Sequence, residues 1–169
     1  MMDILIRDEV PADGAGIEAV TLSAFEMAPY SSHTEQFIIR DLRAAGQMTV
    51  SRVAEYQGAV VGHVAVSPVT VSDGTSGWYG LGPLSVLPEH QGKGIGSLLV
   101  KDALGLLKAQ AASGCVLLGE PEYYSRFGFV ADPQLVLENV PPEYFLAKRF
   151  DNAGAQGEVI YHRAFLARA

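Results

Sequence analysis

Residues 84–99 read LSVLPEHQGKGIGSLL and join two kinds of hydrophobic pattern. Up to Pro88 the stretch has the apolar composition of a β-strand, and from Ile95 onward apolar residues recur at helical spacing. A short polar loop lies between them and contains Gly92, Gly94 and Gly96. The sequence therefore predicts a strand, a glycine-rich loop and a helix, in this order.

The loop has the composition of an anion-binding site. Glycine has no Cβ, so its backbone can approach a ligand closely. The first N–H groups of a helix have no partner within the helix, and the helix dipole favours negative charge there. Phosphate is the anion that this arrangement binds most naturally.

The glycine spacing differs from that of two common nucleotide-binding motifs. It is G-x-G-x-G rather than G-x-G-x-x-G, because residue 97 is Ser, and Lys93 does not follow a glycine pair at the spacing of the GKS/T phosphate loop. Residues 91–96, QGKGIG, instead fit the pattern Q/R-x-x-G-x-G/A. In this respect the sequence resembles the GNAT superfamily of acetyl-coenzyme A-dependent N-acetyltransferases, in which this loop holds the coenzyme A pyrophosphate. For these six residues alone, a plain glycine-rich turn before a helix is the alternative.

A second motif, PEYYSRFGFV at residues 121–130, resembles the same family independently. In that family a tyrosine lies four residues before a Gly-Phe pair, on a short helix after the fifth strand. Here the tyrosine is Tyr124 and the pair is Gly128 and Phe129. The YYxRFGF form resembles one bacterial branch of predicted acetyltransferases. The alternative for Tyr124 is an aromatic side chain packed in the core with its hydroxyl group satisfied.

Composition limits the classes of function. A chain of 169 residues with 49% hydrophobic residues is expected to form one domain, over residues 1–169. Its net charge of −7 argues against a nucleic-acid partner and permits a cationic acceptor. No apolar run has the length of a membrane span, and the N-terminus lacks a signal-peptide pattern. The single cysteine, Cys115, is expected to be a buried thiol, which favours a cytoplasmic location.

Hydrophobic patterning places the other elements. Alternation or continuous apolar runs predict strands at residues 3–9, 48–54, 59–71, 78–87 and 115–118, and helical spacing predicts helices near 17–24, 35–45 and 95–111. Ser32 and Glu35 have the spacing of a capping box for the second helix. After residue 132 the patterning predicts a strand near residues 136–140, a short helical turn or docking segment at 144–146, a loop at 151–157 and a final strand at 158–166.

The resemblance implies the fold. It is a single GNAT-like domain of the α/β (α+β) class, with a mixed, mostly antiparallel central sheet of about six or seven strands and helices on both faces. In the family the first two helices and the loop between them wall the acceptor site. The strand at 78–87 splays from its parallel neighbour there, so that free backbone groups pair with the pantetheine arm. Gly82 and Pro83 fit such a break, and a bulge without a ligand fits them equally well.

The resemblance also implies roles for particular residues. The N–H of Val86 is the candidate for binding the thioester oxygen, with Leu84 and Ser85 beside it along the pantetheine. The backbone of Gln91, Gly92, Lys93, Gly94, Ile95 and Gly96 would hold the pyrophosphate, and a Lys93 side chain that is simply solvated is an alternative to a binding role. Tyr124 is the candidate acid for the coenzyme A sulfur, because a tyrosine with an ordinary pKa of about 10 is protonated at neutral pH. No metal is implied.

The general base is not evident. Many family members carry a glutamate on the fourth strand, but this strand, WYGLGPLSV, has no carboxylate. Glu26, His63, Glu120 and Glu122 are the other candidates, and for His63 a core position is favoured over a catalytic one. No base is needed if the acceptor amine arrives neutral.

Two alternative functions stay open at this point. One is a non-catalytic coenzyme A sensor of the same fold. The other is a phosphate- or nucleotide-binding α/β protein unrelated to acyl transfer. For the acetyltransferase, a small-molecule or peptide amine is expected as acceptor, and the chain is expected to be a monomer or a homodimer.

Overall fold

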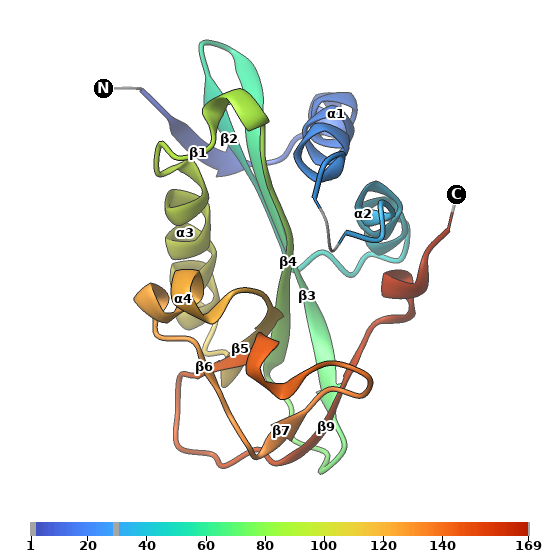
Figure 1. Cartoon of the computed structure of the whole chain (residues 1–169), viewed down its shortest axis with the longest axis vertical. Helices are drawn as coiled ribbons and strands as arrows, with labels where there is room; N and C mark the ends of the chain where they lie inside the picture. Colours follow the sequence, from blue (N-terminus) through green and yellow to red (C-terminus); the bar gives the residue numbers. More distant parts are fainter. Residues whose placement is uncertain (1–2, 29–30, 169) are drawn as a thin grey trace.

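A computed structural model of the chain describes residues 3–28 and 31–168 (Figure 1). Its strands and helices are β1 (Leu5–Asp8), α1 (Gly14–Phe25), α2 (Glu35–Ala44), β2 (Val50–Tyr56), β3 (Ala59–Val71), β4 (Trp78–Val86), α3 (Ile95–Ala109), β5 (Gly114–Leu118), α4 (Pro121–Tyr124), β6 (Val130–Ala131), β7 (Leu135–Val136), β8 (Phe145–Arg149) and β9 (Gly157–Tyr161). Short 3-10 turns occupy Pro88–His90, Ser125–Phe127 and Arg163–Leu166, among others.

A single sheet runs through the molecule, with α1 and α2 on one face and α3 and α4 on the other (Figure 1). Its main path has the strand order β1-β2-β3-β4-β5-β8-β6, and β9 joins the far end of β3 and pairs with β7. Among the described strands, β4–β5 and β7–β9 pair in parallel and the other pairs are antiparallel. The predicted mixed, mostly antiparallel sheet with helices on both faces is confirmed, and β7 and β9 bring it to nine described strands rather than the expected six or seven.

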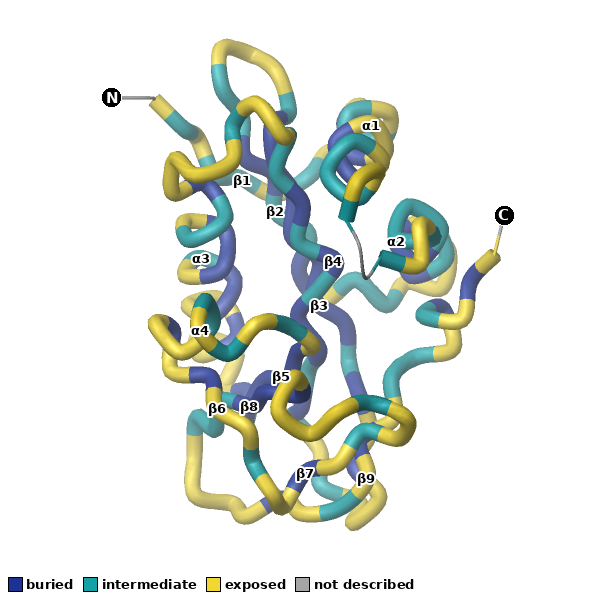
Figure 2. Tube along the Cα trace, viewed as in Figure 1, coloured by how far each residue is buried: buried dark blue, intermediate teal, exposed yellow. Residues whose placement is uncertain are grey.

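Helix α3 supplies the largest packed face of the core. Leu99, Ala103 and Leu107 recur at helical spacing, and each is 0% exposed. They pack against strand residues such as Val64 and Leu117. Figure 2 shows buried stretches of α3 and of the central strands in dark blue. Each fully buried leucine contributes about 2 kcal/mol to stability. This packing fixes the first turn of α3 relative to β4.

The predicted break in the fourth strand is present, as a bulge opposite β3 and as a loss of pairing with β5. Opposite β3 the register jumps so that Gly82 and Pro83 together face Ala65, which is a bulge. On its other side β4 pairs with β5 only through Trp78–Gly80. The remaining part of β4 has no strand partner on this side among the described residues. The fork between β4 and β5 therefore leaves backbone groups of β4 available.

Three local predictions need correction. The helical turn near residue 144 ends at Tyr144, and Phe145 and Leu146 begin β8, because they pair with β5. The final strand ends at Tyr161, since the His162 side chain accepts a hydrogen bond from the Ala164 N–H and starts a 3-10 turn. Ser32 does not form the capping box, and Ser31 Oγ instead donates to the Glu35 carboxylate.

Three other features of the described residues concern the cysteine, membrane-spanning helices and metal-binding clusters. Cys115 is a free, fully buried thiol whose pKa is raised by desolvation, so it is unsuited to nucleophilic chemistry. In residues 3–28 and 31–168 no helix combines the length and apolarity that a membrane span needs. Over the same ranges, no cluster of three or more His, Cys, Asp or Glu side chains is arranged to hold a metal ion.

Candidate active site

A groove of about 450 Å³ opens where β4 ends and α3 begins. The glycine loop forms its floor, α4 and the following turn form one wall, and the C-terminal end of α1 forms the other. Its lining residues are Ala24, Phe25, Ala28, Leu84, Val86, His90, Gln91, Gly92, Gly94, Ile95, Gly96, Ser97, Tyr123 and Arg126. No described carboxylate is among them, although the chain has 19 Asp and Glu residues. The groove is therefore suited to an anion.

The glycine loop has the backbone conformation that an anion site requires. Gly92 and Gly94 have φ of +77° and +86°, a left-handed region that L-residues with a Cβ rarely adopt. A Cβ added at either position would meet nothing within 4 Å. Gly94 is the N-cap of α3, and no side chain caps the helix there. The first N–H groups of α3 thus lack side-chain partners and are available to a ligand.

Most of the predicted binding residues lie together in this groove. Leu84, Val86 and five of the six loop residues line it, and the Gln91 side chain donates a 3.0 Å hydrogen bond to the Val86 carbonyl. The exposed Lys93 side chain does not line it. Nor does Ser85, which is 1% exposed and pairs with His63 in the strand register. Because successive side chains of a strand point to opposite faces, the Ser85 side chain lies on the α1 side of the sheet.

The two adjacent tyrosines occupy different environments. Tyr123 lines the groove, and its hydroxyl oxygen lies 3.3 Å from Ser97 Oγ in the first turn of α3. Tyr124 packs its ring over Gly119 and against Phe127 and Phe129. Burial raises the pKa of Tyr124 to about 12, with a smaller contribution from Tyr123. Tyr124 is therefore protonated at neutral pH, as an acid for a leaving thiolate must be.

Sequence reasoning gave no site role to several groove residues, among them Ser97, Tyr123 and Arg126. A signal for two of them was present in residues 121–130, because residues three apart on a helical turn share a face. The same turn that places Tyr123 toward the groove places Arg126 there as well.

Comparison with known proteins identifies the family. Residues 48–131 match the family model described as an acetyltransferase (GNAT) domain. The uncharacterized N-acetyltransferase YhbS of Escherichia coli K12 is 39% identical over 127 residues, which cover 75% of this chain and 73% of YhbS. The chain belongs to the GNAT acetyltransferase family.

Two solved structures of GNAT proteins match this acetyltransferase over nearly its whole length. A GNAT family acetyltransferase from Brucella melitensis, in complex with acetyl-CoA, is 45% identical with a TM-score of 0.87, and the match covers 98% of this chain and 99% of that one. YhbS from Escherichia coli, in complex with CoA, is 34% identical with a TM-score of 0.90, and the match covers 100% of this chain and 95% of the YhbS chain.

The candidate bases of the acetyltransferase lie outside the groove. His63 is fully buried on the opposite face of the sheet, where its Nε2 lies 2.8 Å from Ser51 Oγ, and burial lowers its pKa to about 4. Glu26 borders a separate hollow with His33. Glu120 and Glu122, at the start of α4, are not among the lining residues. None of these four side chains lines the groove.

Proposed function

We propose that this acetyltransferase transfers the acetyl group of acetyl-coenzyme A to a primary amine by direct attack, with residues 1–169 acting as one domain. The observation that carries the proposal is a single groove that joins an uncapped helix start to the unpaired side of β4. The first offers N–H groups to phosphates, and the second offers backbone groups to the amides of a pantetheine arm. Two relatives that match nearly the whole chain were solved with acetyl-CoA or CoA.

The proposed placement of the co-substrate follows the groove. The pyrophosphate binds the backbone N–H groups from Gln91 to Gly96, where the dipole of α3 adds attraction. The pantetheine then runs along Leu84 and Val86 toward the fork between β4 and β5. Ser85 contributes only its backbone, because its side chain lies on the other face. Lys93 contributes its backbone and a solvated charge.

The proposed reaction needs few protein groups. The nitrogen lone pair of the amine attacks the thioester carbonyl carbon, and the Val86 N–H donates to the oxygen that becomes negative in the tetrahedral intermediate. The carbon–sulfur bond then breaks, and the Tyr124 hydroxyl gives its proton to the leaving thiolate. Solvent reprotonates Tyr124. The attacking nitrogen loses its proton to solvent, because no described carboxylate lines the groove.

The role of Tyr124 is tested by comparing it with its neighbour. Tyr124→Phe is expected to lower kcat about 10- to 100-fold while the Kd for coenzyme A stays within about twofold, because the ring packing survives and only the acid is lost. Tyr123→Phe is the matched control, since it removes a hydroxyl from the same short helix, and it should keep kcat. Steady-state thiol release and calorimetric titration measure the two quantities.

Either of two results would contradict this assignment. Wild-type kcat in Tyr124→Phe would leave that residue with a packing role alone. A loss of kcat in Tyr123→Phe instead would identify the tyrosine that faces the groove as the acid. Thermal unfolding of both variants shows whether the fold is kept.

A coenzyme A sensor without turnover is the second candidate, and the lack of a described carboxylate in the groove favours it. Titration with acetyl-coenzyme A followed by thiol release with a panel of amines separates the two. Micromolar binding, about −8 kcal/mol, together with amine-dependent thiol release supports the enzyme. Binding without release from any amine supports the sensor. No binding up to millimolar concentration would contradict both.

A further inference from the structure

Arg126 is the arginine that lines the groove, and it is held there by an ordered stack. Its guanidinium carbon lies 4.5 Å from the centre of the Tyr123 ring, and its Nε donates a 2.8 Å hydrogen bond to the Tyr123 carbonyl. The Tyr123 hydroxyl in turn lies 3.3 Å from Ser97 Oγ. Arg126 is thereby held on Tyr123, whose hydroxyl reaches the first turn of α3.

The charge of Arg126 is free, in contrast to that of most other arginines. Each of the following forms a salt bridge with an Asp or Glu: Arg7, Arg40, Arg43, Arg52 and Arg149. Within residues 3–28 and 31–168, Arg126 forms no salt bridge, and its two terminal amino groups make no hydrogen bond. In a chain of net charge −7, a cation is thus kept unpaired at the edge of an anion-binding groove.

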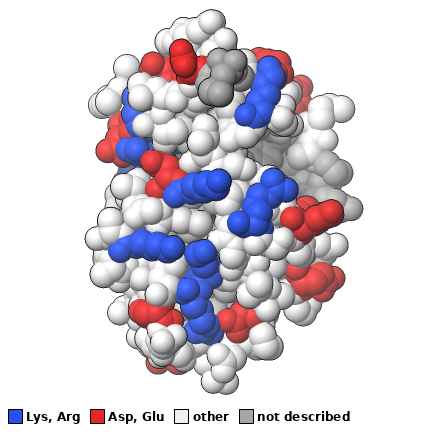
Figure 3. Space-filling view, turned by 90° about the vertical axis from the view of Figure 1, so that its left-hand side faces the viewer, with Lys and Arg blue, Asp and Glu red and all other residues white. Residues whose placement is uncertain are grey.

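The face that carries α3 and α4 has several basic side chains. Figure 3 views the side of the molecule that carries α3 and α4, and Lys and Arg side chains gather across the middle of this face. A guanidinium with two free amino groups presents a planar pair of donors, which matches a terminal phosphate. Stacking on Tyr123 holds that plane in place, so little freedom is lost when an anion binds.

We propose that Arg126 binds the 3′-phosphate of coenzyme A and makes the acetyltransferase prefer it to 3′-dephospho-coenzyme A. Coenzyme A carries a pyrophosphate and a separate dianionic phosphate on its ribose. The helix start and loop amides serve the pyrophosphate, whereas Arg126 is an additional charged donor in the same groove, held on the Tyr123 ring. This assignment rests on the proposed binding of the pyrophosphate at the glycine loop.

Calorimetric titration with coenzyme A and with 3′-dephospho-coenzyme A tests the assignment. The wild-type protein should bind coenzyme A about 10- to 100-fold more tightly, as expected for charge-assisted, bidentate hydrogen bonds. Arg126→Gln should lose most of this preference by weakening coenzyme A binding alone. Arg126→Lys should be intermediate, because it keeps the charge and loses the planar fork. Arg163→Gln is the matched control: it removes the same charge from an exposed site after β9 and should change neither Kd.

Each outcome decides the proposal. An equal loss of affinity for both ligands in Arg126→Gln would move the contact to the pyrophosphate and overturn the 3′-phosphate assignment. An unchanged preference in Arg126→Gln would overturn it too, as would a wild-type protein that does not discriminate the two ligands, and in both cases the proposed function would stand. Failure of the wild-type protein to bind either ligand would instead contradict the proposed function. Arg126 is exposed, so its variants are expected to fold, and thermal unfolding checks this.

Discussion

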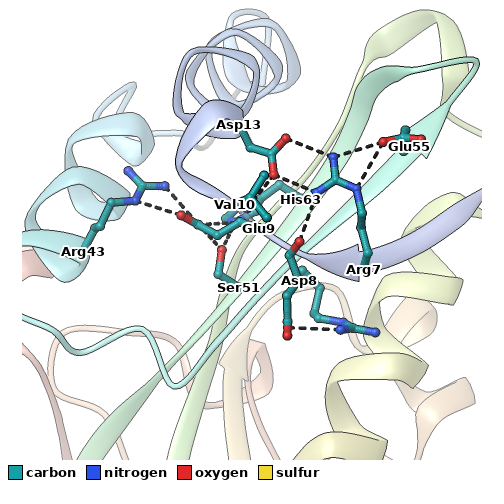
Figure 4. A network of polar contacts seen from close by, with 10 residues as sticks. Arg7, Asp8, Glu9, Val10, Asp13, Arg43, Ser51, Glu55 and His63 are labelled. Carbon is teal, nitrogen blue, oxygen red and sulfur yellow. Dashed lines mark hydrogen bonds and ion pairs between the residues drawn. The ribbon is translucent and has the colours of Figure 1, made fainter.

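Two polar regions lie on opposite faces of β3 and β4. They differ in whether their hydrogen-bonding groups are paired within the protein. On the α1 and α2 side, charged residues from β1, β2, α2 and the turn before α1 bond to one another (Figure 4). Arg7 Nη1 lies 2.7 Å from Asp13 Oδ2, and Arg43 Nη2 lies 3.0 Å from Glu9 Oε1. On the α3 and α4 side, the groove has an uncapped helix start and an unpaired arginine. The first region satisfies its charges internally, so those charges stabilise the fold. The second leaves its donors to a ligand.

The paired region still serves the groove, because it fixes α1. Asp13 accepts two hydrogen bonds from Arg7 and one of 2.7 Å from the Val10 N–H, directly before α1 begins. These contacts lower the pKa of Asp13 to about 2, the Arg7 guanidinium being the main cause. The other end of the same helix carries Ala24 and Phe25 to the wall of the groove. The network therefore holds the start of α1, the helix whose other end lines the groove.

The largest effect is expected when the groove receives a charge of the wrong sign. Gly94→Asp should abolish coenzyme A binding, at least 100-fold in Kd, because a carboxylate at the start of α3 repels the pyrophosphate and the side chain occupies its space. Gly74→Asp is a close control, since Gly74 has φ of +83° against +86° for Gly94 and lies in the turn between β3 and β4. Calorimetric titration of both variants separates repulsion from backbone strain.

Two outcomes would contradict the assignment of the phosphate site to this loop. Unchanged affinity in a folded Gly94→Asp protein would mean that the uncapped helix start is not the phosphate site. An equal loss of affinity in Gly74→Asp would assign the effect to strain at a left-handed position rather than to charge in the groove.

The part of the molecule that local chemistry determines could be predicted from the sequence. The glycine loop was recognisable because left-handed backbone needs glycine, and α3 because its apolar residues repeat at helical spacing. The sequence could also have predicted that the Ser85 side chain faces the other side of the sheet, because it alternates with Leu84 and Val86 along one strand. The fold followed because the motifs also resemble those of a known family.

What the sequence could not supply depends on contacts between distant residues. Phe145 and Leu146 form an apolar pair that suits a helix or a strand, and pairing with β5 decides between them. Whether Tyr123 or Tyr124 faces the groove depends on packing against Gly119 and Phe129. No local pattern connects Glu9, Arg43 and Ser51, so the network on the other face was not predicted.

His63, in the region on the α1 and α2 side, is expected to make the stability of the fold depend on pH. Its pKa of about 4 in the folded chain lies below the ordinary value of about 6.5, chiefly because of burial. As pH falls below 6.5 the unfolded chain therefore takes up this proton first, and folding loses up to about 3 kcal/mol by pH 4. His63→Gln should flatten this part of the profile, measured by urea unfolding between pH 4 and 7. A wild-type slope in that variant would mean that His63 does not titrate as a buried neutral group.

A smaller change in stability is expected from Asp13, the carboxylate at the start of α1. Asp13→Asn should lower the free energy of unfolding at pH 7 by about 1–3 kcal/mol, because Arg7 loses a buried charged partner and keeps only Glu55. Asp41→Asn is the control: its pair with Arg40 is exposed, 39% for Asp41 against 8% for Asp13, and it should matter far less. Since the pKa of Asp13 is depressed, its contribution is present above about pH 4 and disappears as pH falls toward 2. Urea unfolding at pH 7 and near pH 2 tests this dependence. The Kd for coenzyme A, measured on the folded variant, tests whether Asp13 also supports the groove by positioning α1. If Asp13→Asn left stability unchanged while weakening coenzyme A binding, the distinction between a structural network and a ligand-binding groove would fail.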